Sequence, residues 1–158
     1  SLTHVLQTIS GGTTAAAEVT HAVLKDALER GQKVFTVCHS EGSMNVGVAV
    51  NKLNKKLQKN LCIDAYGTPF PLGKDNGDKV RNFVNKADYV YRLGSSGKAV
   101  TRPAINTKDP KIIFADSDKA DAFSNVAGDH GFAGKNYSKF LIANAEEYKD
   151  KYLKQGIQ

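Results

Sequence analysis

The sequence predicts an α/β protein in which a mostly parallel sheet of about five or more strands is flanked by helices. Short apolar runs alternate along the chain with longer runs whose apolar residues recur at helical spacing, which is typical of parallel strands joined by crossover helices. The run at residues 33–39 is apolar on both faces, as a central parallel strand is. With 158 residues, 41% of them hydrophobic, the chain is expected to form a single domain over residues 1–158.

The first half of the chain predicts three strands and two helices. The strands are expected at residues 4–10, 33–39 and 61–67. Thr13 or Thr14 can cap the first helix, which is expected to run to about Arg30 and to stop at Gly31. Its predicted apolar stripe is Ala16, Val19, Val23, Ala27 and Leu28. The second helix is expected after Ser40, with four apolar residues at helical spacing: Val46, Val50, Leu53 and Leu57.

The second half predicts two more strands and a final helix. Residues 68–78 are rich in Pro and Gly and predict a loop. A strand is expected over residues 79–93, running into a loop, and another over residues 111–117. The segment 95–110 is expected as a surface loop or an edge ribbon, and 118–136 as a long connection. The last helix is predicted over residues 137–154, with one apolar face: Leu141, Ala145, Tyr148 and Tyr152.

The formal charge of +6 favours an anionic partner, such as an acidic membrane surface. The lysines are not interleaved with aromatic residues, and no zinc-finger or RNP-type motif is present, so no nucleic acid is expected. No apolar stretch is long enough to cross a bilayer, and the first ten residues lack the features of a signal peptide. The start within a strand-like run suggests a piece of a larger, secreted or effector protein. Cys38 and Cys62 are expected to be free, buried thiols.

The stretch "CHSEGS", from Cys38 to Ser43, lies between a predicted buried strand and a predicted helix. A nucleophile flanked two residues away on each side by a small residue, here Cys38 and Gly42, is the pattern of a nucleophile elbow. Such a turn lifts the hydroxyl of Ser40 above the carboxyl edge of the sheet. It also directs the backbone N–H of Glu41 towards the place where an oxyanion would form. The alternative is that Ser40 is a polar residue that caps the helix.

A serine nucleophile needs a histidine base, and the sequence offers His4, His21, His39 and His130. His130 lies in a Gly-flanked loop after the last predicted strand, where a sheet hydrolase places its histidine. Asp88 follows the fourth predicted strand and is expected to orient that base, with Asp116 as the best alternative acid.

A second oxyanion donor is expected from the loop after the first predicted strand, at the backbone N–H groups of Gly11 and Gly12, to which the hydroxyl of Thr13 or Thr14 could add another. The same glycines could serve as ordinary punctuation between a strand and a helix. A nucleotide-binding loop is a third interpretation, but no P-loop lysine follows and no acidic ribose partner lies at the expected place. No cluster of residues has the spacing of metal ligands, so neither a metal nor an organic cofactor is predicted.

Several of these blocks together resemble the class 3 lipase family of the α/β-hydrolase fold. The resemblance covers the elbow at residues 34–53, "AYGTPFPLG", "NFVNKADYVYRLG" and "GDHGFAGKNY". It implies a hydrolase-like sheet with a reduced N-terminal part, in which Ser40 is the nucleophile, Asp88 the orienting acid and His130 the base, followed by Tyr137. Cys38 replaces the first glycine of the family's elbow, and no lid helix is evident.

The expected function is therefore hydrolysis of carboxylic esters by a lipase-like or phospholipase-like serine hydrolase, with an ester or lipid as the substrate. A membrane-attacking effector or toxin domain with phospholipase activity extends this hypothesis. The rival is a non-catalytic basic binding module on the same fold, because the carboxylate of Glu41 beside the nucleophile would repel an oxyanion.

Overall fold

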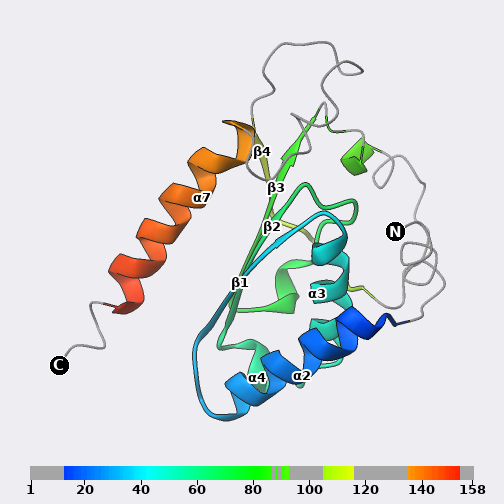
Figure 1. Cartoon of the computed structure of the whole chain (residues 1–158), viewed down its shortest axis with the longest axis vertical. Coiled ribbons are helices and arrows are strands. Elements are labelled where there is room, and N and C mark those ends of the chain that lie inside the picture. The colour runs from blue at the N-terminus through cyan, green and yellow to red at the C-terminus, as the bar shows by residue number, and fades with distance from the viewer. Residues whose placement is uncertain (1–12, 87, 89, 93–104, 116–134, 154–158) are drawn as a thin grey trace.

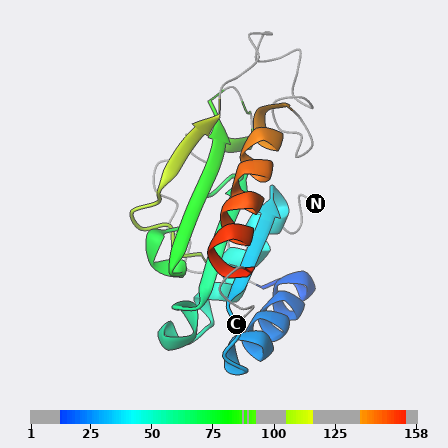
Figure 2. The same cartoon turned by 90° about the vertical axis from the view of Figure 1, so that its left-hand side faces the viewer.

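A computed structural model describes residues 13–86, 88, 90–92, 105–115 and 135–153, which form three layers (Figure 1). The middle layer is a parallel sheet in the order β1-β2-β3-β4. Its strands are Val34–His39, Leu61–Tyr66, Lys79–Asn85 and Ile112–Ala115. One face is covered by α2 (Ala15–Glu29), α3 (Glu41–Asn51) and α4 (Lys55–Gln58), and the other by α7 (Lys135–Tyr148) (Figures 1 and 2).

These layers confirm the α/β class and the parallel sheet flanked by helices. The described sheet has four strands, fewer than the five or more expected, and the strand predicted at residues 4–10 lies outside the described residues. In the described sheet β1 is therefore an edge strand. One of its residues, Val37, is 49% exposed. The expectation that residues 33–39 form a central strand is therefore not met in the described sheet, where Cys38 is the one buried residue of Val34–His39.

The four strands end at the same edge of the sheet. His39 pairs with Tyr66, Tyr66 with Phe83, and Asn85 with Ala115. Since the strands are parallel, every residue that directly follows a strand lies along this carboxyl edge, where α/β proteins place their ligands.

The helix α2 begins and ends as its sequence predicts. The hydroxyl of Thr14 accepts a hydrogen bond from the N–H of Ala17. At the other end Gly31 has a φ of 76° and closes a Schellman motif, in which Gly31 N–H donates to Leu28 and Gln32 N–H donates to Ala27.

The predicted apolar stripe of α2 is right at Leu28, which is buried, but wrong at three positions, because the helix is rotated. Val19 and Val23 are 65% and 63% exposed, and Ala16 is exposed as well. The buried residues are Ala17, Leu24 and Leu28. Two polar contacts to α3 set this rotation: Thr14 Oγ1 donates to Asn45 Oδ1, and His21 Nδ1 contacts the carbonyl of Ala49.

The helix predicted after Ser40 is two helices. α3 ends at Asn51, and Asn54 then caps α4 by accepting a hydrogen bond from the N–H of Lys56. The predicted apolar positions Val46, Val50 and Leu53 are buried. Gly47 lies where α3 packs most closely, since a Cβ there would come within 2.8 Å of a side-chain carbon of Leu72.

β3 is shorter than the predicted strand, whereas the last helical segment covers residues 135–153, close to the predicted 137–154. β3 ends at Asn85, and residues 90–92 are helical. Residues 105–110 form no strand, and residues 93–104 lie outside the described residues. α7 ends at Tyr148 and continues as a π-helical stretch, Lys149–Leu153.

The buried face of α7 also differs from the predicted one. Ala145 is exposed, while Tyr137 and Asn144 are buried. Within the described residues, no helix combines the length and the apolar character that a membrane span requires.

Candidate active site

Ser40 occupies the turn between β1 and α3 in a backbone conformation that L-residues rarely adopt. Its φ is 52° and its ψ is −122°, which costs a residue other than glycine about 1–3 kcal/mol. Its side chain makes no capping hydrogen bond to α3. A serine that only capped the helix would have an extended backbone and such a bond, so helix capping does not explain Ser40.

The backbone around Ser40 is fixed from both sides. The N–H of Ser40 donates to the carbonyl of Tyr66 at 3.0 Å, which extends the pairing of β1 and β2 into the turn. The carbonyl of Ser40 accepts from the N–H and the hydroxyl of Ser43, at 3.0 and 2.5 Å. The surroundings thus hold the strained conformation in place.

The two small residues of the predicted elbow, Cys38 and Gly42, have different surroundings. Cys38 is buried, and its burial raises the pKa of its thiol to about 12, so this sulfur remains protonated and unreactive at neutral pH. Cys62 is also a free, buried thiol, as predicted. A Cβ added to Gly42 would meet no atom of the described residues within 4 Å, so the described residues give no steric reason for a glycine there.

Glu41 is the first residue of α3, so its N–H belongs to the positive end of an eleven-residue helix. That placement suits the predicted oxyanion donor, which stays a prediction. Thr13 is exposed and directly precedes the cap of α2, and Gly11 and Gly12 lie outside the described residues.

Asp88 is 1% exposed and lies at the carboxyl edge, three residues after the end of β3. Its Oδ1 accepts a hydrogen bond from the N–H of Val90 at 2.8 Å, and its Oδ2 accepts from the hydroxyl of Tyr137 at 3.4 Å. The carboxylate therefore also caps the helical turn at residues 90–92.

The predicted base, His130, and the alternative acid, Asp116, lie outside the described residues, as does His4. The other two histidines, His21 and His39, make contacts within the fold. His21 contacts the carbonyl of Ala49 at 3.0 Å, and the ring of His39 meets the edge of the Tyr137 ring at 6.4 Å. The Ser40–Asp88–His130 triad remains a prediction, of which the structure describes Ser40 and Asp88 at one edge of the sheet.

A buried aromatic cluster connects β2, β3 and α7 next to Asp88. Tyr66 and Tyr137 are fully buried, and their rings meet edge to face at 5.7 Å. The hydroxyl of Tyr66 accepts a hydrogen bond from Asn144 at 2.8 Å, and burial raises the pKa of Tyr66 to about 12. Sequence reasoning missed Asn144, since a polar residue on an amphipathic helix resembles a solvent-facing one.

A polar cluster lies on the face of the sheet that α7 covers. Arg81 on β3 and Asp64 on β2 form a buried bidentate ion pair, at 2.7 and 2.8 Å. Arg81 also donates to Glu147 and to the hydroxyl of Tyr148, and Lys79 pairs with Glu147. Asp64 is therefore committed to a structural pair, and the cluster attaches α7 to the sheet.

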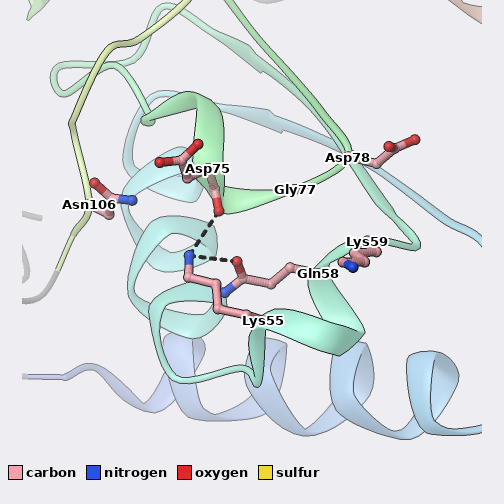
Figure 3. Close-up of a pocket in the computed structure, with 7 residues that line it drawn as sticks. All are labelled: Lys55, Gln58, Lys59, Asp75, Gly77, Asp78 and Asn106. Carbon is pink, nitrogen blue, oxygen red and sulfur yellow. Dashed lines mark hydrogen bonds between the residues drawn. The ribbon is translucent and has the colours of Figure 1, made fainter.

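A hollow lies at the opposite edge of the sheet. It has a volume of about 590 Å³ and is found where β2 and β3 begin (Figure 3). Lys55 already donates to Gln58 and to the carbonyl of Asp75 there, and the charges of two lysines and two aspartates offset each other. In the described part of the chain, no three His, Cys, Asp or Glu side chains gather as a metal site would require.

The chain matches no known protein family, no curated protein and no solved structure. The function must therefore be argued from the geometry of the carboxyl edge.

Proposed function

We propose that the chain is a serine hydrolase of carboxylic esters, with an α/β-hydrolase fold similar to that of class 3 lipases and lipid or phospholipid esters as substrates. The observation that carries the proposal is the backbone of Ser40, with φ 52° and ψ −122° between a strand and a helix at the carboxyl edge. A strained serine at a strand-to-helix turn is the defining geometry of a nucleophile elbow.

The proposed reaction has two stages. His130 takes the proton of Ser40 as the hydroxyl oxygen attacks the ester carbonyl, and Asp88 stabilises the resulting imidazolium. The N–H of Glu41 and one from residues 11–14 hold the oxyanion, and the imidazolium then gives its proton to the departing alcohol. Water, deprotonated by His130, releases the acyl group as a carboxylic acid and restores Ser40.

The buried position of Asp88 supports its role in this scheme. With the N–H of Val90 on one oxygen and the Tyr137 hydroxyl on the other, the carboxylate is oriented, and its burial shields it from water. These are the properties that an acid needs in order to hold a histidine in one tautomer.

Labelling with a fluorophosphonate probe tests the proposal. The wild type should be labelled, and Ser40→Ala should not. His130→Ala and Asp88→Asn should be labelled much more slowly, by at least about a hundredfold. Ser138→Ala, at a half-buried position of α7, is the matched control and should be labelled like the wild type.

The opposite result would favour the binding module. If folded wild type is not labelled, or if Ser40→Ala is labelled equally, the proposed nucleophile is wrong. The position of Glu41 at the first turn of α3 would then indicate a hydrolase fold that has no catalytic role.

A further inference from the structure

One exposed aromatic side chain lies at the carboxyl edge of the sheet. Phe114 is the next-to-last residue of β4 and is 48% exposed. The structure exposes five large hydrophobic residues among those it describes, and Phe114 is the aromatic one. An exposed phenylalanine on an edge strand is costly in water and suggests that something covers it.

Two side chains hold the Phe114 ring without covering it. The ammonium of Lys86 lies 4.7 Å from the ring centroid, and the ring of Tyr91 meets it edge to face at 6.5 Å. Arg92, next to Tyr91, is exposed. We call these four residues the β4 rim: Lys86, Tyr91, Arg92 and Phe114.

Among the described residues, the β4 rim combines an apolar tip with two cations and includes no exposed carboxylate. The one acid within its span is Asp88, which is 1% exposed and bonded to Val90 and Tyr137. Aromatic and basic side chains side by side are typical of surfaces that bind the headgroup region of a membrane.

The β4 rim lies on the same edge of the sheet as Ser40. β4 is three strands away from β1, and neighbouring strands are about 4.8 Å apart, so the separation along the edge is about 14 Å. A membrane that contacts the rim would therefore also face the turn that carries Ser40.

We propose that the β4 rim is an interfacial binding surface for an anionic phospholipid membrane, with Phe114 entering the interface and Lys86 and Arg92 contacting lipid phosphates. The idea that this surface presents substrate to Ser40 rests on the proposed function. Membrane binding by the β4 rim does not depend on it. The net charge of +6 supports an anionic surface over a neutral one. A nucleic acid is the rival partner and is included in the test.

The experiment measures binding to sedimented vesicles of phosphatidylcholine, with and without about 30% phosphatidylserine. It uses the full chain carrying Ser40→Ala, so that hydrolysis does not alter the vesicles. This background should bind the anionic vesicles more tightly than the neutral ones. When Lys86→Gln or Phe114→Ala is added to this background, binding to the anionic vesicles should weaken about fivefold in each case.

Two matched controls lie away from the rim. Lys56→Gln removes an exposed lysine of α4, near the opposite edge of the sheet, and Val23→Ala shortens a 63% exposed apolar side chain of α2. Both should bind like the background variant. Lys86 is exposed, so Lys86→Gln should fold normally and keep the test decisive even if Phe114→Ala unfolds.

Three outcomes would overturn the proposal: equal binding to both kinds of vesicle or to neither, equal losses in the control variants, or tight binding of a single-stranded oligonucleotide that depends on Lys86 and Phe114. Failure of the proposed function looks different, because the wild type would then resist the fluorophosphonate probe while vesicle binding remained. With both proposals correct, Lys86→Gln in the wild type should slow hydrolysis of vesicle phospholipid but leave that of a soluble ester unchanged.

Discussion

The two faces of the sheet are attached to their helices by different kinds of contact. On the face covered by α2, α3 and α4 the buried side chains are mostly aliphatic, and Ala49, Val50 and Ile63 have no exposed surface. On the face covered by α7 they are aromatic or polar, and hydrogen bonds from Asn144 and Arg81 join the layers.

The α7 face is also less completely closed. A groove of about 340 Å³ lies between β1 and α7, and two of its apolar residues, Val37 and Ile142, are 49% and 63% exposed. Aliphatic packing is strong but does not fix directions, whereas hydrogen bonds do. The first face therefore stabilises the helix that follows Ser40, and the second fixes the orientation of Asp88.

The largest effect is expected from breaking the ion pair on the α7 face. Arg81→Met leaves the carboxylate of Asp64, 1% exposed, without its partner. The free energy of unfolding, measured with urea, should fall by about 3–5 kcal/mol. Asp64→Leu with Arg81→Met removes both charges and should recover most of that loss. A double variant as unstable as the single one would show that the α7 face depends on this pair for more than charge balance.

A cavity on the aliphatic face should cost slightly less. Ile63 is fully buried beneath the helices, and Ile63→Ala should lower the free energy of unfolding by about 3 kcal/mol, by urea titration. Val23→Ala, on the exposed side of α2, should change it by less than about 0.5 kcal/mol. If Ile63→Ala also lowered the free energy of unfolding by less than about 0.5 kcal/mol, the face covered by α2, α3 and α4 would be loosely packed.

Sequence reasoning predicted the fold where one residue decides a local structure. Thr14 and Gly31 limit α2 through their own hydrogen bonds and backbone freedom, and the apolar runs at 61–66 and 112–115 are strands. It failed where the tertiary structure decides. The rotation of α2 depends on contacts of Thr14 and His21 with α3, which hydrophobic periodicity cannot predict.

The same distinction applies to the candidate site. The pattern around Ser40 is local, and the structure has the strained turn that this pattern predicts. The contacts of Asp88 with Tyr137 and of Tyr66 with Asn144 join residues 49 and 78 positions apart, so sequence spacing could not reveal them. The family resemblance pointed to Tyr137 but not to its contact.

Relief of the strain at Ser40 should have a smaller effect of opposite sign. Ser40→Gly removes the side chain that opposes a φ of 52°, and the free energy of unfolding should rise by about 1 kcal/mol. Ser40→Ala keeps a Cβ and should not gain this stability, although both variants should lose probe labelling. Equal stabilities of the Gly and Ala variants would show that the turn stores no strain.

The smallest effect should appear at the end of the polar network on the α7 face. The hydrogen bond from Lys79, and then that from Arg81, lowers the pKa of Glu147 from its ordinary 4.5, while partial burial opposes them. A lowered native pKa stabilises the fold above about pH 4.5, and this contribution is lost as the pH falls through the lowered value. Since the Glu147 side chain is 40% exposed, the contribution should be below about 1 kcal/mol.

Urea titrations of Glu147→Gln and the wild type between about pH 7 and pH 3 measure this contribution. The variant should be less stable than the wild type at neutral pH, and the difference should vanish at the acidic end. Glu146→Gln changes the exposed neighbouring carboxylate and should give a smaller difference at neutral pH. If the difference at Glu147 persisted at low pH, the side chain would be stabilising α7 by packing, and the α7 face would resemble the aliphatic face more than its polar contacts indicate.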